Sequence, residues 1–219
     1  MFRALLVLIL VCVLGFAAYV ASLPSEFSVT RSTVISAPPE AVFPHVNSLK
    51  KWDAWSPWAK RDPNSKTEYS GPESGVGAKF TWSGNDEVGV GEMTITDSAP
   101  NELVGLNLKI IEPFPGENPV SLKLTPEGDG TRVTWTISGD QPFVERAILV
   151  AMQVDMETMI GADYETGLAS LKKVAEADVA AQRAAAAAKA EAAAKVAAEK
   201  AAADAKAETE AKAKAKAKA

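Results

Sequence analysis

Hydrophobic and polar residues alternate along the middle of this chain with the period of β-strands. Val29–Ile35 is rich in β-branched residues and threonine, which is typical of a strand. Later alternating segments centre on Phe80, Met93, Leu106, Leu122 and Trp135. Glu127–Gly130, between the last two segments, has the composition of a hairpin turn. The pattern therefore predicts one antiparallel sheet with a single apolar face.

A helical repeat follows the predicted strands and is expected to cover their apolar face. From about Pro142 onward, large apolar residues recur at helical spacing: Ile148, Leu149, Met152, Met156, Met159, Ile160, Leu168 and Leu171. Gly161 and Gly167 interrupt this repeat. Because glycine costs about 1 kcal/mol relative to alanine inside a helix, we expect either a kink or close packing at these two positions. A short earlier helix is expected to start at Pro38–Glu40, where proline needs no N–H partner.

The N-terminal segment is predicted to be a membrane anchor over residues 1–23. Its uncharged apolar run, Ala4–Ala21, is close to the roughly 20 residues that a helix needs to span a bilayer core. A cleaved signal peptide is the alternative, although its apolar region is usually shorter. Arg3 precedes the run and no Lys or Arg follows until Arg31. The positive-inside rule then predicts a single-pass plasma (inner) membrane protein, with its N-terminus cytoplasmic and its domain on the extracytoplasmic side.

The C-terminal segment, residues 175–219, is low-complexity Ala, Lys and Glu. Alanine favours helix, and Glu191 and Lys195 form a favourable i,i+4 pair. Large apolar residues are nearly absent, so we expect a solvated tail that is partly helical or disordered, or a coiled coil. The basic stretch Lys212–Lys218 could contact an anionic polymer or lipid, or could simply be a charged spacer. The folded domain is then expected over residues 24–174.

The composition of the chain argues against several kinds of partner and site. A formal net charge of −5 argues against a nucleic-acid partner. The only cysteine, Cys12, lies in the N-terminal apolar run, so the folded domain is not expected to hold an internal disulfide. His45 is the only histidine and has no nucleophile motif nearby, which argues against a Ser-His-Asp system and a zinc site. We therefore predict no catalytic residue, no metal and no cofactor.

Two segments and the order of the elements carry a family resemblance. Ala37–Phe43 reads APPEAVF, Asp53–Trp58 reads DAWSPW, and the region Phe27–Val174 runs from strand through short helices and strands to a long helix. This order resembles the START-like (SRPBCC) superfamily, which includes polyketide cyclases/dehydrases, pollen-allergen-type proteins and lipid-transfer domains. The resemblance implies an α+β helix-grip fold, in which an antiparallel sheet wraps around a long C-terminal helix and an apolar cavity lies between them.

The candidate ligand-binding residues follow from that implied cavity. They are the aromatic and methionine side chains expected at its wall or mouth: Trp52, Trp55, Trp58, Phe80, Trp82, Met93, Phe114, Trp135, Met152, Met156 and Met159. Large aromatics and adaptable methionines suit apolar ligands, but each could equally be ordinary core. The tryptophans, in particular, could plug one end of the core.

Three functions remain open from the sequence. The resemblance implies binding or transport of a lipophilic small molecule, such as a lipid, an isoprenoid or a polyketide-like compound. The first alternative is a cyclase or aromatase acting on a hydrophobic substrate. The inward faces are nearly all apolar and lack a paired acid and base, which favours binding over catalysis. The second alternative is an envelope scaffold or interaction protein that acts through its tail.

Overall fold

A computed structural model describes the backbone of residues 2–113 and 115–216 and the side chains of 2–113 and 115–202. The chain forms two compact units, Met1–Glu176 and Ala177–Ala219. The first unit holds the whole sheet and all the elements that position the candidate site. The second unit is helical as far as Lys216 and carries the Ala, Lys and Glu repeat.

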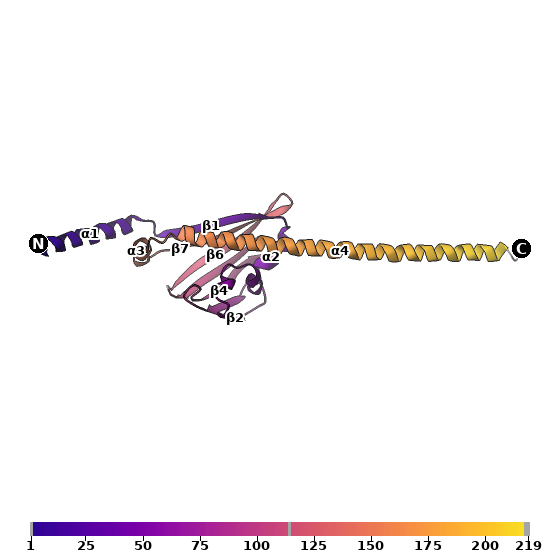
Figure 1. Ribbon diagram of the computed structural model, residues 1–219, viewed down its shortest axis with the longest axis horizontal. Coiled ribbons are helices and arrows are strands. Elements are labelled where there is room, and N and C mark those ends of the chain that lie inside the picture. The colour runs from indigo at the N-terminus through magenta and orange to yellow at the C-terminus, as the bar shows by residue number, and fades with distance from the viewer. Residues whose placement is uncertain (1, 114, 217–219) are drawn as a thin grey trace. The chain divides into compact units, whose positions relative to one another are not determined.

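Seven antiparallel strands form one sheet in the order β1-β7-β6-β5-β4-β3-β2 (Figure 1). Their bounds are β1 Glu26–Ile35, β2 Lys66–Ser70, β3 Lys79–Ser83, β4 Val90–Ala99, β5 Leu103–Glu112, β6 Gly116–Glu127 and β7 Gly130–Asp140. The strand register aligns one row of buried side chains across five strands: Val29, Ile137, Val120, Leu106 and Ile95. This row confirms the predicted apolar face, since residues that share a row and face pack against one another.

The helices are α1 Phe2–Ser22, α2 Pro39–Val46, α3 Phe143–Met152 and α4 Met156–Lys216, with short 3₁₀ helices η1 Leu49–Ala54 and η2 Trp58–Lys60. Within the first unit, α4 passes along the sheet (Figure 1). It buries Tyr164, Leu168, Leu171 and Ala175, whose spacings of three and four residues place them on one side of the helix. The seven-stranded sheet with its long C-terminal helix is the expected helix-grip arrangement.

The single helix expected from Pro142 onward is wrong, because the chain breaks between α3 and α4. Gln153 adopts a left-handed conformation (φ 55°) and its N–H caps the end of α3. Asp155 then caps the start of α4: its carboxylate accepts bonds from the Glu157 backbone N–H (3.1 Å) and the Thr158 hydroxyl (2.5 Å). Gly161 and Gly167 lie inside α4, where both sit in close packing.

Acid is expected to remove the charge contribution of the Asp155 cap. The Thr158 hydroxyl, followed by two backbone N–H groups, holds the pKa of Asp155 below its ordinary value of 3.8. Stabilisation from a depressed carboxylate pKa is present above 3.8 and is lost as the pH falls through the lower folded-state value. Thermal unfolding measured against pH should show Asp155→Asn melting below wild type at pH 7. The two should converge in acid, and a constant difference at every pH would contradict this.

The edge strand β2 was not predicted, because Lys66–Ser70 is too polar to show alternation. Only Tyr69 in this segment is half-buried. The features that favour a strand here are Thr67 and Tyr69, which lie between two turn sequences, Asp62–Asn64 and Gly71–Pro72. Missing this strand also meant missing Tyr69 as a candidate site residue.

Helix α1 is long and apolar enough to span a membrane, with a mean hydropathy of 2.8. Its 21 residues correspond to about 31 Å at 1.5 Å per residue, close to the roughly 30 Å of a hydrocarbon core. Val20, near its C-terminal end, is the only buried residue in the helix. An N-terminal signal sequence has the same length and composition, so both alternatives from the sequence remain.

Candidate functional site

A tryptophan cluster fills the space between β7 and α4. We define it as Trp52, Trp55, Trp58 and Trp135. The rings of Trp52, Trp55 and Trp58 approach Trp135 edge-on, with centroids 5.7, 5.3 and 5.9 Å away. Such edge-to-face contacts are favourable beyond the area they bury. Trp52, Trp55 and Trp58 are close together in the sequence, whereas Trp135 comes from strand β7.

Helix α4 closes over this cluster through Tyr164. The Tyr164 ring stacks on Trp135 with centroids 3.9 Å apart and planes 9° apart. A Cβ on Gly167 would lie 2.8 Å from the Trp135 ring, so glycine is what lets α4 come this close. Burial raises the pKa of Tyr164 and keeps it protonated. These contacts make the cluster a packed part of the core.

The indole N–H groups of the buried tryptophans differ in their partners. Trp52 and Trp55 donate to the carbonyls of Val46 and His45, each at 3.1 Å. The buried Nε1 of Trp135 has no acceptor among the described residues. An unpaired buried donor costs about 1–3 kcal/mol. The Trp135 ring is therefore held by packing rather than by a hydrogen bond.

A second aromatic group lies on the same sheet face, toward the β2 edge. We call Tyr69, Phe80 and Trp82 the aromatic row. In the strand register, Tyr69 lies opposite Phe80, and Phe80 lies opposite Met93. The pairing continues through β5 and β6 to β7, so these side chains are on the same sheet face as Trp135. Phe80 lies 5.0 Å from Tyr69 and 5.6 Å from Trp82, measured between ring centroids. All three side chains, and Met93 beside them, are half-buried and so keep contact with solvent.

Glycine and a backbone carbonyl hold the Trp82 ring in place. A Cβ on Gly91 would lie 2.4 Å from that ring, so the indole lies directly over the glycine of the neighbouring strand. The Trp82 N–H donates to the Val88 carbonyl at 2.9 Å. A pocket of about 340 Å³ borders Trp82, Gly91 and Ile111. The aromatic row thus has one rigid end beside an open volume.

Tyr69 contributes the polar group of the aromatic row. Its hydroxyl donates to both carboxylate oxygens of Asp53, at 3.1 and 3.0 Å. Burial, followed by the Asp53 charge and its hydrogen bond, raises the pKa of Tyr69 well above its ordinary value. Tyr69 also borders a pocket of about 220 Å³ together with Lys50 and Lys79. At neutral pH this tyrosine is a hydrogen-bond donor and cannot serve as a general base.

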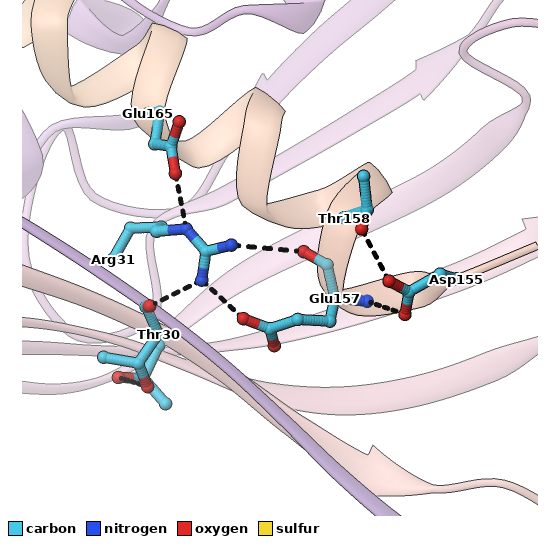
Figure 2. Close-up of polar contacts among 7 residues, drawn as sticks. Thr30, Arg31, Asp155, Glu157, Thr158 and Glu165 are labelled. Carbon is cyan, nitrogen blue, oxygen red and sulfur yellow. Dashed lines mark hydrogen bonds and ion pairs between the residues drawn. The ribbon is translucent and has the colours of Figure 1, made fainter.

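An ionic cluster fixes the start of α4 on β1 (Figure 2). The Arg31 guanidinium donates to the carboxylates of Glu157 and Glu165, each at 2.7 Å. These hydrogen bonds, with Glu157 first, raise the pKa of Arg31. A Cβ on Gly161 would lie 2.1 Å from the guanidinium, so the glycine leaves room for it. Arg31 on β1 lies directly opposite Trp135 on β7, so the ionic cluster is next to the tryptophan cluster.

The three helical methionines proposed from the sequence, Met152, Met156 and Met159, do not lie in either aromatic group. Met152 and Met159 are 65% and 51% exposed, and Met156 is half-buried at the start of α4. Phe114 lies outside the described residues, as do the side chains of Lys212–Lys218.

His45 is buried in α2, and its carbonyl accepts the Trp55 indole bond. Among residues 2–113 and 115–202, no group of three or more His, Cys, Asp or Glu side chains is placed to hold a metal ion.

A sheet face lined with apolar side chains and gripped by a C-terminal helix defines a hydrophobic ligand-binding fold. The family described as polyketide cyclase/dehydrase and lipid transport matches residues 26–176, so the chain belongs to this family. No curated protein sequence matches the chain.

Solved structures share the fold at low sequence identity. The Aha1 dimer from Colwellia psychrerythraea is 20% identical, with a TM-score of 0.50 over 68% of this chain and 96% of that one. A Staphylococcus aureus protein of unknown function is 13% identical, with a TM-score of 0.52 over 70% and 96%. A Chromobacterium violaceum protein is 16% identical, with a TM-score of 0.49 over 70% and 99%. The first two likenesses extend to the fold alone.

Proposed function

We propose that this protein binds and carries a lipophilic small molecule, such as a lipid, an isoprenoid or a polyketide-like compound. The observation that carries the proposal is the half-buried aromatic row, Tyr69, Phe80 and Trp82, with Met93 beside it. These side chains share a sheet face with the core but keep exposed surface. Covering them with an apolar ligand would gain about 25 cal/mol for each Å² removed from water.

The ligand surface that we propose uses only some of the candidate residues named from the sequence. Trp52, Trp55 and Trp135 are at most 6% exposed, so their role in the proposal is to form the rigid floor of the site. Trp58 is half-buried at the rim of that floor. Rigid aromatic walls suit apolar ligands because little side-chain entropy is lost on binding. The exposed methionines are assigned no ligand contact.

Membrane anchoring fits this function. We propose that α1 stays uncleaved in the plasma (inner) membrane and holds the domain on the extracytoplasmic side. Apolar ligands partition into bilayers, so a tethered carrier would meet them at high local concentration. A reporter active only outside the cytoplasm, fused after Lys216, should be active. Activity of a cytoplasm-specific reporter at the same position would contradict the orientation.

Catalysis is the weaker alternative. Tyr69 and Asp53 form the one tyrosine–carboxylate pair beside the aromatic row among the described residues. The raised pKa of Tyr69 leaves it protonated at neutral pH. Such a pair can orient a ligand oxygen or hold the row in position, which supports binding. Turnover of a polyketide-like compound that is lost in Tyr69→Phe would instead favour an enzyme.

The direct test is to identify what the chain carries. Full-length protein released from its own membranes should retain an apolar molecule in native mass spectrometry, and lipid extraction should identify its class. Phe80→Ala removes the central ring of the row and should reduce ligand affinity about tenfold, equivalent to about 1.4 kcal/mol. Val76→Ala trims an exposed apolar side chain in the loop before β3 and is the matched control. Equal ligand retention in both variants would overturn the proposed site.

A further inference from the structure

Helix α3 carries an apolar face that the folded chain leaves uncovered. None of its residues is buried. Val144, Ile148 and Met152 recur every four residues, which places them on one side of the helix. They are 67%, 38% and 65% exposed, and Phe143 beside them is 43% exposed. An exposed apolar patch of this kind marks an interaction surface.

Strand pairing holds the start of α3 beside the end of α1. Helix α1 ends at Ser22, and β1 begins at Glu26. Glu26 pairs with Asp140, the last residue of β7, three residues before α3 begins. The Gln141 N–H also donates to the Ser25 carbonyl at 2.6 Å. The chain therefore enters α3 next to the linker that leaves α1.

Helices α1 and α3 also contact each other directly. The Arg146 guanidinium of α3 donates to the Leu23 carbonyl, one residue beyond α1. Val20 is fully buried, although the rest of α1 is not. The linker 23–25 can extend at most about 10 Å. If α1 spans a bilayer, the short linker and the Arg146 contact hold the start of α3 close to the membrane surface.

We propose that α3 is an interfacial helix that lies on the bilayer that α1 spans, with Val144, Ile148 and Met152 inserted among the lipids. An amphipathic helix with one apolar side buries that side at the boundary between headgroups and acyl chains. The occupant of the exposed face is the lipid bilayer, because α3 lies against the helix that is proposed to span it. Two membrane contacts would also stop the domain from rotating freely about its linker. This inference depends on α1 remaining as an anchor and not on the ligand proposed above.

Site-directed spin labelling of the full-length chain tests the inference. The background is Cys12→Ser, which removes the only native cysteine. Nitroxide labels are attached at Val144→Cys or Ile148→Cys in liposomes of phosphatidylethanolamine and phosphatidylglycerol. Both positions should shift toward accessibility to oxygen and away from a water-soluble nickel complex. Val76→Cys, 59% exposed in the loop before β3, is the matched control and should report water.

A second variant separates membrane contact from folding. Adding Val144→Asp and Ile148→Asp to a chain labelled at Met152→Cys should move that label toward water. The melting temperature in detergent should change little, because neither side chain is buried in the folded chain. Loss of the fold in detergent would show that the face is core, and would overturn the proposal.

Three other results would also overturn it. Labels at Val144→Cys and Val76→Cys with equal nickel accessibility would place α3 in water. Dipolar broadening between labels at Val144→Cys, relieved by dilution with unlabelled chains, would assign the face to a second copy of the protein. A label on native Cys12 that reports water would show that α1 does not span the bilayer.

Discussion

Replacing Trp135 by alanine is expected to lower the free energy of unfolding by about 3–5 kcal/mol. Trp135 is 1% exposed, and four aromatic rings pack against it. Removing the indole leaves a cavity that these rings cannot fill, because each is fixed by other contacts. Urea unfolding of the full-length chain in nanodiscs, followed by near-ultraviolet circular dichroism, gives the difference. Trp82→Ala, at the half-buried end of the aromatic row, is the control and should cost less.

The reason for the loss can be tested with a smaller change. Trp135→Phe removes the indole N–H but keeps an aromatic ring stacked on Tyr164. Because that N–H has no acceptor among the described residues, no hydrogen bond is lost and the cost should be well below that of Trp135→Ala. Trp55→Phe, by contrast, leaves the buried His45 carbonyl without its donor. A Trp135→Phe loss as large as that of Trp135→Ala would show that the packing argument is wrong.

Gly167→Leu is expected to lower the free energy of unfolding by about 3 kcal/mol, through overpacking against Trp135. A Cβ at this position would lie 2.8 Å from the Trp135 ring and 3.1 Å from Pro57. The ring cannot move away, because its opposite surroundings are Tyr164 and the other tryptophans. The same unfolding measurement applies.

Helix propensity alone predicts that replacing Gly167 would stabilise the protein, which is the opposite of the overpacking prediction. Gly167→Ala should gain about 1 kcal/mol if propensity alone mattered. We expect a net loss, because the close contact with Trp135 outweighs that gain. Ala169→Gly, at an exposed position of the same helix, measures propensity alone and should lose about 1 kcal/mol. A stabilised Gly167→Ala variant would mean that α4 can shift outward without loss.

Most of the fold followed from local patterns. The five central strands showed apolar alternation, because a sheet with one buried face imposes a period of two on them. The edge strand β1 was indicated by its β-branched residues and threonine instead. The other edge strand, β2, showed neither pattern, since Lys66–Ser70 buries too little to need apolar residues. The break at Gln153–Asp155 also escaped prediction, because helical spacing continued on both sides of it. A three-residue turn that preserves the apolar period leaves almost no trace in the sequence.

The candidate site was predictable only in part. Trp52, Trp55 and Trp58 lie within seven residues of one another, so their clustering was visible. Which side chains are buried and which keep solvent contact depends on partners far along the chain. Tyr164 covers Trp135, whereas Phe80 is only half-buried.

The sequence by itself determined the sheet, its apolar face, the long apolar N-terminal helix and the Ala, Lys and Glu tail, because each is a regular pattern of neighbouring residues. Only the tertiary structure decided that Arg31 lies beneath Gly161, that Gly167 admits the Trp135 ring, and that α3 turns its apolar face outward. These features depend on strand register and on the rotation of each helix about its axis. The helix rotations are fixed by contacts between residues far apart in the sequence, such as Arg31 with Glu165, and no local pattern records them.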